Sequence, residues 1–116
     1  MKDIKGTLQY NGKDIEYVFD LNVLQSIQEE YGSLSKWGEL TDGSATSEPD
    51  AKAVIFGFTE MINEAVDMAN DENGTNEPFY TRKQVGRILT EFGFANAVTA
   101  MNTTIAESTQ SSEKNA

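Results

Sequence analysis

The sequence predicts an α+β domain that is mostly helical, with an antiparallel β-hairpin at about residues 4–10 and 14–19 and about five helices after it. Across the hairpin segments, apolar and polar residues alternate on both sides of a turn dipeptide, which is the period of half-buried strands. From residue 20 onward the apolar positions recur every three or four residues, which is the period of a helix. At 116 residues the chain is also long enough to bury one core.

The hairpin is predicted around Asn11-Gly12, because this dipeptide tolerates the positive φ angles of a type I′ turn. If these two residues form the loop, one face of the hairpin carries the pairs Leu8 with Ile15, Gly6 with Tyr17 and Ile4 with Phe19. The opposite face carries the polar residues Lys5, Thr7, Gln9, Asp14 and Glu16. Two strands alone are not stable in water, so the apolar face must pack on the helices or join the sheet of another chain.

Two helices are predicted directly after the hairpin. Asp20 is a good N-cap for the first helix, and Gly32 is suited to its C-terminal end. The apolar stripe of this helix is Leu21, Leu24, Ile27 and Tyr31. Ser33 can cap a short second helix, in which Leu34, Trp37 and Leu40 recur every three residues. Residues 41–47 are small and polar, and they indicate a loop.

The third helix is predicted to be the longest. Its start is indicated by Ser47-Glu48-Pro49-Asp50, which offers a capping hydroxyl, an early proline and an acid in the first turn. A single band of its surface carries Ala51, Val54, Ile55, Phe58, Met61, Ile62, Ala65 and Ala69. The acids near residues 67–72 crowd the negative end of the helix dipole, so we expect fraying into a loop at 73–78.

Two further helices are predicted in the C-terminal part. Thr81 and Gln84 form a capping box, and the helix that they open carries Val85, Ile88, Leu89 and Phe92 on one face before it ends at Gly93. The final helix carries Phe94, Val98, Met101 and Ile105 at helical spacing. We therefore expect one domain over residues 1–107 and a disordered polar tail over residues 108–116.

The charge balance and the residue types exclude several classes of function. Nine basic against 19 acidic side chains give a net charge of −10, which disfavours binding to nucleic acids and to anionic membranes. No window approaches the roughly 18 apolar residues that span a bilayer, so we expect a cytoplasmic protein. The chain contains no Cys and no His, which excludes thiol and histidine catalysis and the usual zinc sites.

The carboxylates do not form a recognisable active site or metal site. The pairs Glu29-Glu30 and Asp71-Glu72 lack apolar neighbours that would raise a pKa, and both are typical of a solvated acidic surface. Asp71 resembles the first ligand of a calcium loop, but Asn76 then stands at the glycine position and Arg82 at the glutamate position. We therefore predict no catalytic residue, no cofactor and no metal, and a protein that is not an enzyme.

Two aromatic residues are candidate partner-binding residues. Phe56 lies on the side of the third helix opposite the apolar stripe, where it either contacts a partner or is covered by the hairpin or the second helix. Trp37 lies on a short helix beside a flexible loop, where it either anchors an interface or packs in the core.

The C-terminal helices supply the remaining candidates. Arg82, Lys83 and Arg87 form a basic cluster at a helix N-terminus, where the dipole disfavours cations, so they either meet a partner or form a solvated face with Arg87 paired to Glu91. Residues 92–106 carry no charge, which indicates a docking surface for a second subunit or a partner helix, or else a marginally stable helix. The partner-binding candidates on this last helix are Phe94, Val98 and Met101.

The order of these parts resembles small tail assembly chaperones of long-tailed bacteriophages and related prophages. The resemblance rests on residues 12–22, which include Phe19-Asp20-Leu21-Asn22, on Glu29-Glu30-Tyr31-Gly32-Ser33, and on residues 81–85, which open a later helix. It covers nearly the whole chain up to Glu107. It implies a non-enzymatic helper in the bacterial host cytoplasm, which binds the tape-measure protein and recruits tail-tube protein subunits during assembly.

A second hypothesis rests on the net charge alone. A small acidic regulator can mimic nucleic acid and block the basic groove of a DNA-binding protein. Such a mimic would hold its acids in rows spaced like phosphates and would bind in a salt-sensitive way, whereas a chaperone would bind mainly through apolar surface.

Overall fold

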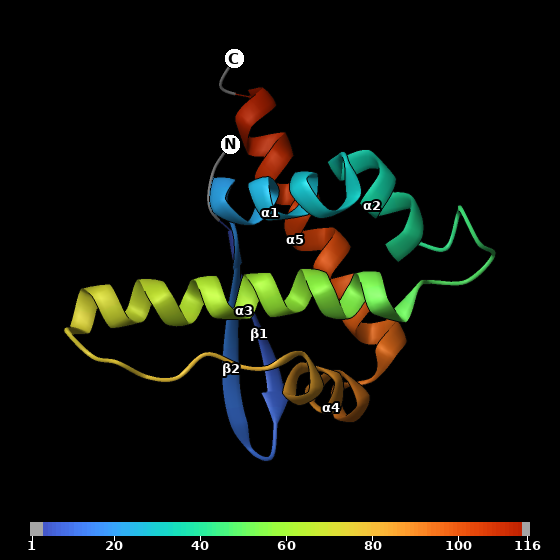
Figure 1. The fold of residues 1–116 in the computed structure, drawn as a ribbon. Helices are drawn as coiled ribbons and strands as arrows, with labels where there is room; N and C mark the ends of the chain where they lie inside the picture. Colours follow the sequence, from blue (N-terminus) through green and yellow to red (C-terminus); the bar gives the residue numbers. More distant parts are fainter. Residues whose placement is uncertain (1–3, 115–116) are drawn as a thin grey trace.

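A computed structural model of the chain describes residues 4–114, and the side chains of residues 4–109. Within that range a two-stranded antiparallel hairpin is followed by five helices, which confirms the predicted α+β, mostly helical fold (Figure 1). The elements are β1 Ile4–Tyr10, β2 Lys13–Phe19, α1 Leu21–Tyr31, α2 Leu34–Thr41, α3 Ala51–Asn73, α4 Arg82–Phe92 and α5 Phe94–Lys114.

The hairpin has the predicted register. Leu8 faces Ile15 and Gly6 faces Tyr17, and the turn residues Asn11 and Gly12 both have positive φ angles, of 51° and 72°. β2 begins at Lys13, one residue earlier than expected. Leu8, Ile15, Tyr17 and Phe19 are all buried. In this chain the apolar face therefore packs on the helices, and not on the sheet of another chain.

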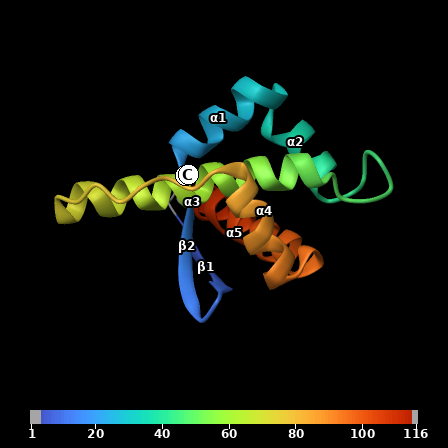
Figure 2. The same ribbon diagram turned by 60° about the horizontal axis from the view of Figure 1, so that its bottom comes forward.

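α3 is the central element of the fold and crosses the hairpin (Figure 1, Figure 2). The Phe58 ring packs edge-on against Tyr17 of β2, with ring centroids 5.1 Å apart. The Tyr17 hydroxyl lies 3.3 Å from the Thr104 hydroxyl of α5, so one tyrosine connects the sheet to two helices. The largest fully buried side chains include Leu8, Phe19, Ile27, Trp37, Phe58, Met61, Ile62, Ile88 and Met101.

The first two helices begin where the sequence predicts. The Asp20 carboxylate accepts a hydrogen bond from the Val23 N–H (3.1 Å), and the Ser33 hydroxyl accepts one from the Lys36 N–H (3.1 Å). The buried side of α1 differs from the prediction, because Leu21 is 66% exposed and Val23 is buried. Leu21 is the first residue of its helix, where the chain has only just left the sheet.

α3 has a different N-cap from the prediction and ends close to where the loop is predicted. Asp50 is the N-cap in place of Ser47, and its carboxylate accepts hydrogen bonds from the N–H groups of Lys52 and Ala53. The helix ends at Asn73, the first residue of the predicted loop. Gly74 adopts the left-handed conformation there and donates its N–H to the Asn70 carbonyl, which closes the last turn.

The predicted disordered tail over residues 108–116 differs from the structure, in which α5 continues as a helix to Lys114. Ser108 is buried, and the Thr109 hydroxyl donates a hydrogen bond to the Ile105 carbonyl (3.1 Å). A polar composition favours disorder, but small hydroxyl side chains can also fit against neighbouring elements or bond to their own helix. Residues 115 and 116 lie outside the described range.

Candidate functional site

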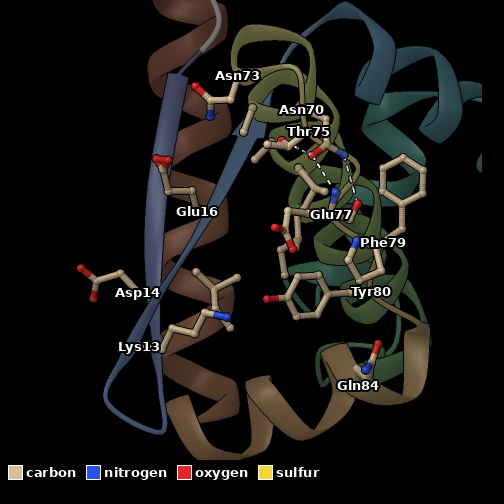
Figure 3. A pocket seen from close by; sticks show the side chains of 16 residues that line it. Lys13, Asp14, Glu16, Asn70, Asn73, Thr75, Glu77, Phe79, Tyr80 and Gln84 are labelled. Carbon is tan, nitrogen blue, oxygen red and sulfur yellow. Dashed lines mark hydrogen bonds between the residues drawn. The ribbon is translucent and has the colours of Figure 1, made fainter.

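An open groove of about 700 Å³ lies beside the hairpin (Figure 3). We call it the β2 groove. β2 contributes Lys13, Asp14, Ile15 and Glu16, and the C-terminal half of α3 contributes Ile62, Ala65, Val66, Ala69, Asn70 and Asn73. The remaining lining residues come from the segment that runs back along α3 and from the start of α4, and they are Thr75, Glu77, Pro78, Phe79, Tyr80 and Gln84.

The apolar part of the groove comes from a stripe that was predicted to be core. Ala65 and Ala69 continue the buried face of α3 beyond Ile62, but no other element covers them completely, and Ala69 is exposed. α3 extends past the hairpin, so the last turns of its apolar stripe have no sheet to pack on (Figure 2). The groove lies between these uncovered turns and β2.

The segment opposite β2 has no regular secondary structure, yet two asparagines of α3 hold it. The Asn63 amide donates to the Tyr80 carbonyl (3.0 Å), and its oxygen accepts from the Tyr80 N–H (2.8 Å). Two helical turns later, the Asn70 amide makes the same pair of bonds to the carbonyl and N–H of Glu77, at 3.1 and 2.9 Å. Each amide therefore pairs with the backbone as a neighbouring strand would.

The groove follows the free edge of β2. Four successive residues of the strand line it, and successive side chains of a strand point to opposite faces, so the groove runs along the edge and not over one face. In a hairpin closed by a two-residue turn, every second residue directs its N–H and C=O away from the partner strand. In β2 these residues include Asp14 and Glu16, which lie opposite Gln9 and Thr7 of β1.

The rim of the groove is mainly acidic. Asp14, Glu16 and Glu77 line it together with a single cation, Lys13. Lys13 points across the groove towards Tyr80, whereas Asp14 points away from it on the outer face of the sheet (Figure 3). Phe79 is 58% exposed at the rim, which is unusual for a residue of its size. The groove thus combines an apolar surface, unpaired backbone groups and negative charge.

One carboxyl with a shifted pKa lies outside the groove, between α1 and α3. The pKa of Glu64 is raised to about 7, first by a hydrogen bond with the Asp20 carboxyl and then by partial burial. The Asn22 amide donates to the same Glu64 carboxylate (2.8 Å), which opposes the rise. Because Asp20 also caps α1, this cluster connects the start of α1 to α3, and Glu64 is not among the lining residues of the β2 groove.

The structure buries four of the seven predicted partner-binding residues. Trp37 donates its Nε1–H to the Ala53 carbonyl (2.9 Å) inside the core. Phe56 is only 6% exposed, because Tyr31 packs edge-on against its ring and the Arg82 guanidinium lies 5.2 Å from the ring centre. Val98 and Met101 are buried as well. Of the two alternatives for Phe56, the structure shows the buried one, and α1 and α4 cover the ring in place of the hairpin or the second helix.

The other three predicted residues are accessible but lie outside the groove. Lys83 and Arg87 are exposed on α4, and Phe94 is 38% exposed at the start of α5. Glu91, the expected partner of Arg87, accepts a hydrogen bond from the Asn11 N–H of the hairpin turn (2.8 Å).

Sequence reasoning did not find the β2 groove. Its one local signal was Phe79, a large aromatic residue in an otherwise polar loop. Asn63 and Asn70 gave no signal, since asparagine on a helix usually faces water. No group of three or more acidic side chains placed to hold a metal ion occurs among residues 4–109. No helix within residues 4–114 is long and apolar enough to cross a membrane.

Comparisons with known protein families, with curated proteins and with solved structures return no match for this chain.

Proposed function

We propose that the protein is a non-catalytic assembly chaperone, similar to those that assist tail assembly in long-tailed bacteriophages, and that it binds tape-measure and tail-tube proteins in the bacterial cytoplasm. The observation that carries the proposal is the β2 groove, an open surface in which apolar side chains lie beside the unpaired edge of a strand. Such a surface is suited to holding segments of other proteins before they assemble.

Two further observations support a binding role over catalysis. The whole sequence lacks His and Cys, the side chains most used for proton transfer and nucleophilic attack near neutral pH. Among the side chains of residues 4–109, the carboxyl with a pKa near 7 is Glu64, which connects two helices and does not line the groove. The choice of tail proteins as partners rests on the resemblance of the hairpin and α1 passage to tail assembly chaperones.

Co-expression tests this proposal directly. The full chain carrying an affinity tag is produced together with fragments of the tape-measure protein, or with the tail-tube protein, of the same genome. We expect both tail proteins to be retained at moderate salt, while an unrelated coiled-coil protein of similar length is not. Retention of neither tail protein, with tight and salt-sensitive binding to a DNA-binding protein instead, would favour the acidic mimic.

A further inference from the structure

We propose that the β2 groove binds an extended peptide that pairs with the outer edge of β2 as a third strand, with apolar and basic side chains alternating along it. The inference rests on the proposed function and deepens it, because it states which form of partner the groove holds.

The backbone of β2 supplies the first half of the recognition. The sheet described by the structure has two strands, so no strand pairs with the outer edge of β2. Asp14 and Glu16 are exposed and direct their N–H and C=O groups to that edge. The four lining residues of β2 span about 13 Å at the usual rise per residue, which is enough for a short strand to pair.

The opposite wall is already ordered. The side-chain amides of Asn63 and Asn70 each make two hydrogen bonds to the backbone, at Tyr80 and Glu77 respectively. The Thr75 hydroxyl also donates a hydrogen bond to the Asn70 side-chain oxygen (2.9 Å). A peptide that enters the groove does not have to order this segment, which lowers the entropic cost of binding.

Side chains on the two faces of the incoming strand meet different surfaces. On the inner face lie Ile15 and the apolar residues Ala65 and Val66 of α3, which line the groove and can contact apolar side chains. On the outer face lie the carboxylates of Asp14 and Glu16. Neighbouring strands place facing side chains on the same side of a sheet, so the occupant needs apolar residues inside and Lys or Arg outside.

The same charges disfavour a second copy of the chain as the occupant. Pairing of β2 with β2 of another copy would bring the Asp14 and Glu16 carboxylates of both copies together on one face. Like charges on facing positions of neighbouring strands are destabilising, and each copy already carries a net charge of −10. Charge complementarity therefore selects a basic segment of another protein.

The probe is a synthetic peptide, acetyl-Lys-Val-Lys-Phe-Lys-Val-Lys-amide with a fluorescent label, titrated with the full-length protein and followed by fluorescence anisotropy. We expect saturable binding. A peptide with the same residues in an order that breaks the alternation should bind at least several-fold more weakly, although its charge is the same. A peptide with Glu at every Lys position should not bind at all. Equal binding of the alternating and reordered peptides would overturn the proposal.

Backbone pairing is tested on the native protein with methylated peptides, so that folding of a variant is not at issue. Methylation of every second backbone nitrogen gives two peptides, one in each register. Loss of the N–H groups that face β2 should weaken binding roughly threefold to tenfold per bond, whereas methylation in the other register should have a smaller effect. If neither peptide binds more weakly than the parent, the peptide does not pair with the strand.

Two proline variants then show whether the peptide pairs with the outer edge of β2 or with that of β1. Glu16→Pro removes an N–H that faces the groove, and Thr7→Pro removes the equivalent N–H of the facing residue on β1. Circular dichroism and thermal melting establish that each variant is folded. We expect Glu16→Pro to weaken peptide binding about tenfold and Thr7→Pro to leave it unchanged. The reverse pattern would place the peptide on β1 and overturn the assignment.

The two proposals can fail separately. If tail proteins bind the native chain and Glu16→Pro equally well and the peptide does not bind, the groove assignment fails and the chaperone proposal stands. If the peptide binds as expected and no tail protein is retained, the groove assignment stands and the chaperone proposal fails. Sedimentation showing a dimer that Glu16→Pro abolishes would make a second copy the occupant and overturn the inference.

Discussion

At the scale of single residues, a few close contacts decide how the helices pack. Gly57 of α3 lies directly under the Trp37 ring, and a Cβ atom added there would be 2.3 Å from Trp37 Cζ2. The Trp37 Nε1–H in turn reaches the Ala53 carbonyl of α3. The pair Trp37 and Gly57 therefore fixes the position of α2, and the only tryptophan of the chain serves the core and not an interface.

Replacement of Gly57 by Ala is expected to destabilise the fold. The new methyl group would overlap the Trp37 ring, and overpacking of this kind costs about 1–3 kcal/mol of the free energy of unfolding. Gly38 of α2 is the matched control, because nothing lies within 4 Å of a Cβ atom added there. Gly38→Ala should be neutral or stabilise by up to about 1 kcal/mol through helix propensity. Urea unfolding of both variants measures the difference, and equal effects would contradict this packing.

Glu64 is expected to make stability depend on pH. Its pKa is about 7 in the folded chain against an ordinary value of 4.5, so the folded state binds the extra proton. The stability that this proton contributes is complete below about pH 4.5 and is lost as the pH rises through 7.

Glu64→Gln should remove this dependence, because an amide can donate to Asp20 at any pH. We therefore expect the variant to gain stability relative to the native chain between pH 5 and pH 8. Urea unfolding across that range, with the exposed Glu72→Gln as the control, provides the measurement. If the free energy of unfolding of the native chain changes with pH in the same way as that of Glu64→Gln, then Glu64 and Asp20 do not share a proton.

At the scale of elements, the segment between α3 and α4 shows how an irregular stretch can be ordered from outside. Residues 75–80 carry neither strand nor helix, and α3 supplies the hydrogen bonds that a neighbouring strand would otherwise provide. The length of α3 matters for the same reason. Its last turns extend beyond the hairpin and carry both the apolar side of the β2 groove and Asn70, which holds the wall opposite β2.

Asn63→Ala is expected to loosen this segment. The change leaves the N–H and carbonyl of the partly buried Tyr80 without their partner, which costs about 1–3 kcal/mol. Amide hydrogen exchange followed by NMR should show faster exchange at Tyr80, while amides in the middle of α3 keep their protection. Asn73→Ala, at the end of the same helix, is the control. Unchanged exchange at Tyr80 would mean that the Asn63 amide does not hold the segment.

At the scale of the whole molecule, one hydrophobic core contains residues of the hairpin and of all five helices of residues 4–114. α5 packs against the hairpin and α4. Thr104 and Ser108 are buried on α5, and Thr104 meets the Tyr17 hydroxyl between the hairpin and this helix. The C-terminal residues therefore belong to the folded body at least as far as Thr109. The charge of −10 is spread over this body and favours encounter with basic partners.

Truncation tests the part of α5 that was predicted to be disordered. A chain that ends at Glu107 loses the buried Ser108, and its melting temperature should fall by several degrees because a contact in the core is lost. A chain that ends at Thr109 keeps Ser108 and should lose less. Identical melting temperatures for both truncated chains and the full chain would mean that α5 contributes nothing to stability beyond Glu107.

The sequence by itself determined the elements whose signals are local. The Asn11-Gly12 turn fixed the register of the hairpin, and the capping residues Asp20, Ser33 and Thr81 fixed the starts of three helices, because these interactions act between residues that are close along the chain. Periodicity also identified most of the core. The same signals failed at Ser108, a small polar residue that is buried on α5.

Only the tertiary structure decided which apolar residues remain accessible. Phe56 lies opposite the main stripe of α3 and is nevertheless buried, because α1 and α4 bring Tyr31 and Arg82 over it. Ala69 lies in the stripe and is nevertheless exposed, because α3 extends past the hairpin that it crosses (Figure 2). The β2 groove depends on this extension of α3 (Figure 2) and on hydrogen bonds between residues seven to 17 positions apart. A local sequence pattern does not show which residues far apart in the chain contact each other, so the candidate site can be identified only in the folded molecule.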